Sequence, residues 1–239
     1  MSVADLVLLH GFAGTGRAWD PVLERLDAQT YRAVAPDLRG HGAATAARPV
    51  SFDACAADAL SAGRAPVTLC GYSMGGRIAL HAALADPERV GRLVLVATTA
   101  GIDDEDERSA RRASDEQLAA FADTATPEAF ADRWAAQPLF AGTPPDTAQI
   151  WREDMLRNDP AGLAVVLRGI GTGAMAPLWD RLGELTMPTT VVAGERDAKF
   201  VALGERLAVA IPGAELVVVP GAGHGLPREA PRALAAVLA

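Results

Sequence analysis

The chain has 239 residues, half of them hydrophobic, and a net charge of −8. This length and apolar content suit one large α/β unit with a single core. The acidic balance, without any block of lysine and arginine, argues against a nucleic-acid partner. The first residues lack a basic region followed by an apolar stretch, and no apolar run approaches ~20 residues. We therefore expect a cytoplasmic protein that neither spans nor binds a membrane.

Short β-rich runs alternate with helical patterns along most of the chain. We expect strands at 6–10, 32–36, 67–72, 92–98, 189–194 and 214–219. Such alternation predicts an α/β fold with a mostly parallel sheet and helices on both faces. The active residues should then lie at the carboxyl ends of the strands.

The alternation breaks between residues 101 and 180. This stretch opens with a charged helical pattern, and Thr126-Pro127 and Asp159-Pro160 are typical helix starts. We expect 101–180 to form a helical cap over the active end of the sheet, with 1–100 and 181–239 forming the core. The cap would select the substrate.

Only five residues precede the first predicted strand. Arg32 to Ala35 is therefore expected to form an exposed edge strand, unless a partner or a loop covers it. A homo-oligomer is compatible with the sequence, which does not fix the oligomeric state.

A serine lies at the predicted junction between the third strand and the next helix, in Gly71-Tyr72-Ser73-Met74-Gly75. A G-x-S-x-G turn strains the chain so that the serine hydroxyl stands above the sheet, and the glycines avoid clashes there. Ser73 is the candidate nucleophile. The alternative is an ordinary glycine-rich turn between a strand and a helix.

A serine at its free pKa is a poor nucleophile and needs a base. Of four histidines, His224 is the best candidate because it follows the predicted strand at 214–219. His10 and His41 each stand in a His-Gly pair, where a structural loop role is expected, and His81 lies within a helix.

An acid that orients the histidine should follow another strand. Asp197 fits, because it comes just after the predicted strand at 189–194. Glu195 is the second choice, whereas Asp180 lies before that strand.

Backbone N–H groups should stabilise a developing negative charge beside Ser73. The amide of Met74 is one expected donor, since it follows the nucleophile. The amide of Phe12, in the loop after the first strand, is the other. The Phe12 side chain should then face the pocket, although it could instead pack against the next helix.

Two further sequence features could suggest a metal or cofactor site, but we infer neither from them. Cys55 and Cys70 are isolated and are expected to be buried thiols. Residues 171–176 spell G-x-G-x-x-A, but this stretch follows a helical pattern and leads into Pro177, so we reject a dinucleotide site.

The chain resembles the α/β-hydrolase superfamily over nearly its whole length. Several stretches look more narrowly like the 2-succinyl-6-hydroxy-2,4-cyclohexadiene-1-carboxylate synthase family of menaquinone biosynthesis. These stretches are 71–77, 137–141, 171–173 with Leu178-Trp179, and, most specifically, 194–200. The resemblance implies a lyase, in which a serine–histidine–aspartate set removes a proton and pyruvate is eliminated without an acyl-enzyme.

The resemblance also implies a small substrate with several carboxylates. Arginine suits such a substrate because its planar fork binds a carboxylate in bidentate fashion. By the family pattern the substrate-binding residues are Arg77, either Arg111 or Arg112, Arg157, Tyr72 and Trp134.

Each of these assignments has a plain alternative. Arg77 could pair with an acidic neighbour, the cap arginines could be solvated, and Trp134 could belong to the core of the cap. The sequence also departs from the family, which tends to show a second histidine near Pro227 and a proline at Arg39.

Two other functions remain open. One is a carboxylesterase, thioesterase or carbon–carbon hydrolase that uses the same three residues, with an acyl-enzyme at Ser73 in the ester case. The other is a non-catalytic binding protein, whose usual sign is loss of a triad residue; all three are present.

Overall fold

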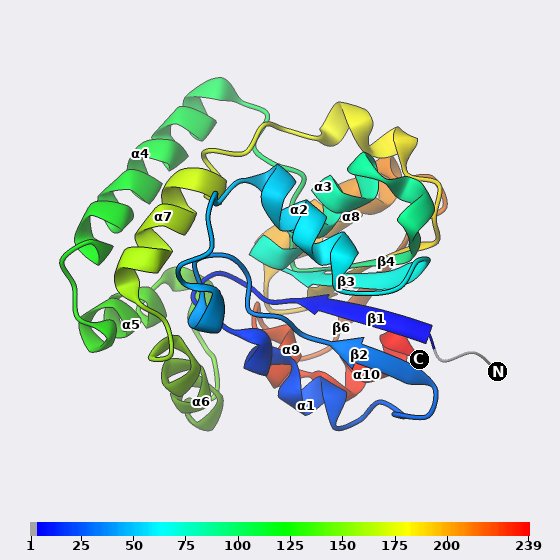
Figure 1. Ribbon diagram of the computed structural model, residues 1–239, viewed down its shortest axis with the longest axis horizontal. Coiled ribbons are helices and arrows are strands. Elements are labelled where there is room, and N and C mark those ends of the chain that lie inside the picture. Colours follow the sequence, from blue (N-terminus) through cyan, green and yellow to red (C-terminus); the bar gives the residue numbers. More distant parts are fainter. Residues whose placement is uncertain (1–3) are drawn as a thin grey trace.

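A six-stranded parallel sheet forms the centre of the computed structural model, which describes residues 4–239 (Figure 1). The strand order is β2-β1-β3-β4-β5-β6, and every neighbouring pair is parallel. The strands are β1 (Ala4–Leu9), β2 (Tyr31–Val34), β3 (Val67–Tyr72), β4 (Val90–Val96), β5 (Thr189–Gly194) and β6 (Glu215–Val219). The six predicted strands are confirmed, with each end within two residues of the expected one.

The central strands are apolar on both faces because helices cover both sides of the sheet. Leu69 of β3 and Leu93 and Leu95 of β4 have no exposed surface. Truncation of such a leucine to alanine typically costs about 2–5 kcal/mol. The parallel register, in which Leu9 lies beside Gly71 and Tyr72 beside Val96, brings the loops after these strands to one end of the sheet.

β2 lies at one edge of the sheet, as predicted. It pairs only with β1 in the part of the chain that the structure describes. Arg32 is exposed there and forms an ion pair with Asp5 of β1. A charged side chain on an edge strand disfavours edge-to-edge aggregation.

Helices cover the two faces of the sheet (Figure 1). One face carries α2 (Phe52–Ser61), α3 (Met74–Ala85) and α8 (Ala198–Ala210), with side chains of these helices in one apolar cluster. The other face carries α1 (Asp20–Leu23) and α10 (Pro231–Leu238), which contribute to a second cluster. The short helix α9 (Leu226–Glu229) leads into α10. This layering confirms the predicted fold class.

Between β4 and β5 the chain forms a helical insertion at the end of the sheet toward which the strands point (Figure 1). Its helices are α4 (Glu105–Ala122), α5 (Pro127–Ala135), α6 (Pro145–Met155) and α7 (Pro160–Ile170). Asp104, Thr126 and Asp159 cap three of them by accepting hydrogen bonds from backbone amides. These caps satisfy amides that the first turn leaves free, which is why the helices begin where the sequence predicts.

The insertion has an apolar cluster of its own, which includes Leu118, Phe130 and Leu163 and takes in Ala13 from the core loop after β1. Short 3-10 turns lie at Gly16–Trp19, Gly42–Ala44, Pro87–Arg89, Pro138–Phe140 and Trp179–Glu184. None of the helices within residues 4–239 has the length and apolar composition that crossing a membrane requires.

Candidate active site

Ser73 occupies the tight turn between β3 and α3. Its backbone has a φ of 51° and a ψ of −108°, a region that costs a residue other than glycine about 1–3 kcal/mol. A Cβ atom at Gly71 would collide with the backbone of Gly75, and one at Gly75 would collide with the carbonyl of Leu9. The glycines therefore let the helix start against the sheet, and the strained turn holds Ser73 at its end.

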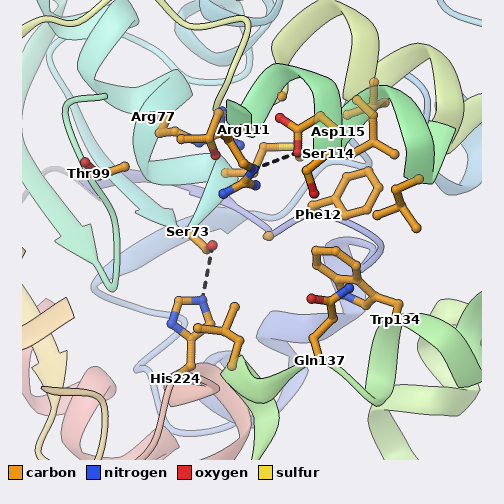
Figure 2. Close-up of a pocket in the computed structure, with 18 of the residues that line it drawn as sticks. Phe12, Ser73, Arg77, Thr99, Arg111, Ser114, Asp115, Trp134, Gln137 and His224 are labelled. Atoms are coloured by element: carbon orange, nitrogen blue, oxygen red, sulfur yellow. Dashed lines mark hydrogen bonds and ion pairs between the residues drawn. The ribbon is translucent and has the colours of Figure 1, made fainter. Parts of the chain in front are cut away.

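Ser73, His224 and Asp197 form one hydrogen-bonded chain across three strand ends. His224 Nε2 lies 3.2 Å from Ser73 Oγ (Figure 2). On the other side of the ring, His224 Nδ1 lies 2.7 Å from Asp197 Oδ2. Asp197 Oδ1 also accepts a hydrogen bond from the amide of Phe200 at 3.3 Å. His224 is buried, so its ring is held by these contacts rather than by water. The arrangement can move a proton from the serine to the histidine while the carboxylate stabilises the imidazolium.

The other candidate acids lie elsewhere. Glu195 is exposed and accepts a hydrogen bond from the amide of Gly221, not from His224. Asp180 is exposed in the 3-10 turn Trp179–Glu184. Of the three acids weighed from the sequence, only Asp197 reaches the histidine.

His10 and His41 shape the loop after β1, as expected from their His-Gly pairs. His10 Nε2 accepts a hydrogen bond from the amide of Leu38, and His41 Nε2 accepts one from the amide of Ala13. Burial lowers the pKa of both rings, and for His41 the nearby His10 adds to the effect. Neutral rings can accept these bonds, so His41 fixes the backbone beside Phe12 and His10 ties the loop after β1 to Leu38.

The amides of Phe12 and Met74 are the expected charge-stabilising donors. Met74 is the first residue of α3, where helix geometry leaves its N–H without a partner in the helix. Within residues 4–239 neither amide donates to a protein acceptor. Both residues line the same cavity as Ser73. The Phe12 ring faces this cavity and also packs edge-on against Trp134, with ring centroids 4.9 Å apart.

A cavity of about 370 Å³ lies between the strand ends and the cap. Residues of the core and of the cap both line it (Figure 2). The residues singled out in the sequence that line it are Phe12, Tyr72, Ser73, Met74, Arg77, Arg111, Trp134 and His224. Trp134 lines the cavity and also packs against the apolar cluster of the cap. It therefore fits both positions considered from the sequence, the pocket wall and the core of the cap.

The lining of this cavity is cationic. It contains the four basic side chains of Arg77, Arg111, Arg133 and Lys199 against a single acid, Asp115. Asp115 is already occupied, because it accepts hydrogen bonds from Arg111 Nε at 2.7 Å and from the amide of Gly173 at 3.0 Å. A cavity with excess positive charge in a chain of net charge −8 favours an anionic ligand.

Arg77 is the most buried of these cations, with 6% of its surface exposed. Its Nη1 donates to the carbonyl of Ile170 at 2.6 Å, and no carboxylate of the described chain forms an ion pair with it. Burial, and then the charge of Arg111, lowers the pKa of Arg77 to about 9, so the side chain is still protonated at neutral pH. Asp115 lies near enough to raise the pKa of Arg77, but its side chain bonds Arg111 instead. Within residues 4–239 the buried charge of Arg77 therefore has no acid in direct contact.

Arg112 and Arg157 do not line the cavity. Arg112 Nε donates to the carbonyl of Gly173, and Arg157 is half-exposed with Nε 4.0 Å from Asp154. The side chain beside Arg157 makes the contact with the core instead. Asn158 is buried, donates to the carbonyl of Ala13 and accepts from the amide of Gly42.

The sequence reasoning missed two cationic wall residues, Arg133 and Lys199. The sequence contains a hint for each residue. Arg133 adjoins Trp134, which was expected in the pocket, and Lys199 is the only lysine of the chain and lies two positions after Asp197. Neither periodicity nor motif spacing shows which way such a side chain points, because the cap and the core meet only in the tertiary structure.

The G-x-G stretch after α7 has a packing role. A Cβ atom at Gly171 would collide with the carbonyl of Leu167, and one at Gly173 with the backbone of Arg112 in α4. The stretch follows a helix, as the sequence indicated, and forms the turn that Asp115 holds against α4. Among residues 4–239 no group of three or more histidine, cysteine or acidic side chains is placed to hold a metal ion.

A second cavity, of about 120 Å³, adjoins the first. The two share Gly11, Phe12, Tyr72, Trp134 and Phe140 as a common wall. Burial raises the pKa of the Tyr72 phenol, which therefore stays protonated in this wall. The aromatic wall gives the main cavity an apolar side.

Comparison with known proteins shows the family to which the chain belongs. Residues 6–237 match the alpha/beta hydrolase family. A Salmonella heidelberg (strain SL476) 2-succinyl-6-hydroxy-2,4-cyclohexadiene-1-carboxylate synthase is 34% identical over 95% of this chain and 89% of its own length. A Bacillus subtilis (strain 168) protein provisionally named as the same synthase is 37% identical over 95% of this chain and 86% of its own.

Solved structures agree with these matches. The structure of MenH from S. aureus has a TM-score of 0.92 and 31% identity, covering 100% of this chain and 93% of that one. A malate-bound thermophilic esterase from Thermogutta terrifontis has a TM-score of 0.83 and 27% identity, covering 99% and 88%. From the strained serine turn, the parallel sheet and these matches, we conclude that the chain belongs to the alpha/beta hydrolase family and is homologous to the 2-succinyl-6-hydroxy-2,4-cyclohexadiene-1-carboxylate synthases.

Proposed function

We propose that the protein is a lyase that eliminates pyruvate from a succinyl-cyclohexene-carboxylate intermediate of menaquinone biosynthesis. The observation that supports this function most strongly is the cationic cavity beside Ser73 in a chain whose net charge is −8. Such a concentration of positive charge favours the binding of a small polyanion. The 34% identity to a 2-succinyl-6-hydroxy-2,4-cyclohexadiene-1-carboxylate synthase over 95% of the chain supports the same function.

The carboxylates of this reaction match the cations of the cavity. The product named for the relatives carries a succinyl group and a ring carboxylate, and the departing pyruvate is a third carboxylate. Arg77 and Arg111 lie on the opposite side of Ser73 from His224 (Figure 2), while Arg133 and Lys199 complete the basic lining. Each carboxylate can thus have a cationic partner, and bidentate arginine contacts would fix the orientation of the ring.

The proposed proton transfer begins at Ser73. Asp197 holds the Nδ1–H of His224, so that Nε2 can take the serine proton. The serine oxygen then removes the ring proton next to the succinyl carbonyl. The C–H electron pair moves through the ring, a new C=C bond forms, and the C–O bond to the pyruvyl group breaks. His224 returns a proton to the departing enolate, so atoms and charge balance without an acyl-enzyme.

The amides of Phe12 and Met74 serve the same step. Removal of a proton beside a ketone places negative charge on the carbonyl oxygen, and two free backbone donors would stabilise that oxygen. Loss of one such donor typically costs about 10²–10³ in rate.

A hydrolase is the second candidate, because the serine turn, the histidine and the two free amides serve ester hydrolysis equally well. The esterase from Thermogutta terrifontis, which is described as malate bound, and an enol-lactonase from Burkholderia xenovorans LB400 share the fold at 27% and 25% identity. On this alternative Ser73 would attack the carbonyl carbon and form an acyl-enzyme, which water would release.

A paired assay separates the two functions. Purified protein is given the menaquinone-pathway intermediate, with pyruvate release followed by a coupled dehydrogenase, and separately a short-chain nitrophenyl ester; each assay is repeated with Ser73→Ala. Ser73-dependent pyruvate release with negligible ester hydrolysis would support the lyase. Ser73-dependent ester hydrolysis without pyruvate release would refute it in favour of the hydrolase.

A further inference from the structure

A buried carboxylate holds the backbone on both sides of His224. Glu229 Oε2 accepts a hydrogen bond from the amide of Gly223 at 2.7 Å, and its Oε1 accepts one from the amide of Gly225 at 3.1 Å. Only 4% of the Glu229 side chain is exposed. The two amides that flank the histidine are therefore tied to one rigid group.

Arg196 joins this carboxylate to the cap. Its Nη2 donates to Glu229 Oε2 at 2.7 Å, and its Nη1 donates to the carbonyl of Gly142 at 2.7 Å. Gly142 lies in the cap loop between the 3-10 turn Pro138–Phe140 and α6, and Arg196 directly precedes Asp197. One guanidinium fork thus connects a cap loop with the segments that carry the acid and the histidine.

The cap also touches this loop directly. Trp151 of α6 packs so closely on Gly225 that a Cβ atom there would overlap the indole ring. Gly194 packs in the same way on the backbone of Ala222 and Gly223, which fixes the turn of Asp197 against the loop of His224. The ion pair therefore lies where three packed segments meet.

We propose that Arg196 and Glu229 are a positioning pair. Through this pair, the packing of the cap loop at Gly142 against the core helps to set the position of His224. Its effect on catalysis rests on the proposed function only in that His224 acts as the base. Neither side chain lines the cavity that holds Ser73, so neither is expected to touch the substrate.

The physical reason is the satisfaction of a buried charge. Glu229 is stable in its position because three donors compensate for its desolvation, and Arg196 is the only one of them that carries charge. If the arginine is lost, the carboxylate and the loop that it organises are left to rearrange. A displacement of a base by about 1 Å can cost about 100-fold in rate.

Three variants test the pair. Glu229→Gln keeps the size of the side chain but turns an amide NH₂ toward one of the two flanking amides. Arg196→Met keeps the length of the stem and removes both contacts. Arg181→Met is the matched control, because Arg181 forms an ion pair of similar length with Glu184 and is similarly exposed, 50% against 41% for Arg196, but lies outside both cavities.

We expect Glu229→Gln to lower kcat by about 10- to 100-fold with KM changed by less than about threefold. Arg196→Met should lower kcat less and raise KM by about fivefold, because the cap loop is released as well. The double variant should resemble Glu229→Gln rather than the product of the two single effects, since both changes break one unit. Arg181→Met should behave as the wild type.

Hydrogen exchange supplies a readout that does not depend on turnover. In Glu229→Gln the amides of Gly223 and Gly225 should exchange faster, and in Arg196→Met the amides of Ala141 and Thr143 should do so as well. Unchanged exchange at Gly223 and Gly225 in both variants would overturn the proposal, as would purely multiplicative effects on kcat. If wild-type protein releases no pyruvate, the lyase proposal fails by itself, and the exchange data with nitrophenyl ester turnover still decide the role of the pair.

Discussion

The core side and the cap side of the cavity are built in different ways. On the core side, Ser73, Asp197 and His224 follow strand ends and are held by backbone strain, glycine contacts and hydrogen bonds. On the cap side, Arg111 and Arg133 project from helices and are held by other side chains, Arg111 by Asp115 and Arg133 by the ring of Phe121 at 4.3 Å.

The contrast indicates which part of the site can accept substitutions. A position fixed by the backbone tolerates little substitution, so the core side suits a proton-transfer apparatus that serves many reactions. A wall of side chains on packed helices can be altered one residue at a time without loss of the fold. We therefore expect variants on the core side to change kcat and variants on the cationic wall to change KM.

The largest effect should come from the core side. Ser73→Ala removes the group that exchanges a proton with His224, and we expect kcat to fall by about 10³-fold or more with little change in substrate affinity. Ser114→Ala is the matched control, since Ser114 lines the same cavity from α4 but is not bonded to the histidine. Steady-state kinetics provide the measurement, with the substrate that the wild type turns over. An equal fall in kcat in both variants would contradict the distinction between the two sides.

Arg77 belongs to the core helix α3 and lines the cavity together with the cap arginines, so its variant tests the border between the two sides. Arg77→Met should raise KM by about 10- to 100-fold, because a buried charged hydrogen-bond donor is lost. The free energy of unfolding without ligand should rise by about 1 kcal/mol, since the variant no longer buries a charge that lacks a direct ion-pair partner. Kinetics and chemical denaturation measure the two effects, and a clear loss of stability would contradict this account of Arg77.

Ligand binding should reveal the same charge in the wild type. A small dicarboxylate such as succinate should raise the Tm in a concentration-dependent manner, because binding to the folded state alone stabilises it. At 100 times the Kd the gain corresponds to about 2.7 kcal/mol. The shift should be lost in Arg77→Met; a neutral diamide of the same length is the control ligand and should leave the Tm unchanged.

Lys199 should have a smaller effect, because it is exposed. Lys199→Gln should raise KM by about three- to tenfold and leave kcat nearly unchanged, whereas Lys199→Arg should retain the wild-type KM. As the only lysine of the chain, Lys199 can also be acetylated selectively apart from the N-terminal amine. Peptide mass spectrometry should show slower acetylation of Lys199 in the presence of an anionic ligand; equal rates would place Lys199 outside the binding site.

The smallest effects should come from the two arginines that do not reach the cavity. Arg112→Gln and Arg157→Gln should each change KM by less than about twofold, because one bonds a backbone carbonyl and the other is half-exposed. Arg111→Gln, on the same helix as Arg112, is the positive control and should raise KM several-fold. A large rise in KM in Arg157→Gln, together with a wild-type KM in Arg111→Gln, would show that the cap closes differently around the substrate.

Sequence reasoning worked best where local chemistry dictates structure. The strands followed from apolar runs, and two cap helices begin after Thr126 and Asp159, the expected capping residues. The charged pattern that opens the cap also forms a helix, which Asp104 caps. The turn of Ser73 followed from its glycines, because no other residue fits the close backbone contacts there. Such features depend on a few neighbouring residues and can be derived from a single chain.

Sequence reasoning was weakest for side chains on the cap. Arg111 and Arg112 are adjacent in α4, yet only Arg111 lines the cavity, because neighbouring residues of a helix point about 100° apart and the packing of α4 decides which one faces inward. Arg157 was expected at the cavity, whereas Asn158 beside it makes the buried contact with the core.

Strand patterns, helix caps and glycine turns are local, so the amino-acid sequence is enough to predict the α/β architecture, the helical insertion and the order of serine, acid and histidine along the chain. The packed structure was needed to show that Asp197, the acid preferred from the sequence, reaches His224 whereas Glu195 does not. It also brings Lys199 and Arg133 into one cavity with Arg77 and Arg111, and it reveals that Glu229 holds the histidine loop. Those relations join residues far apart in the chain, and they are set by how the cap packs on the sheet.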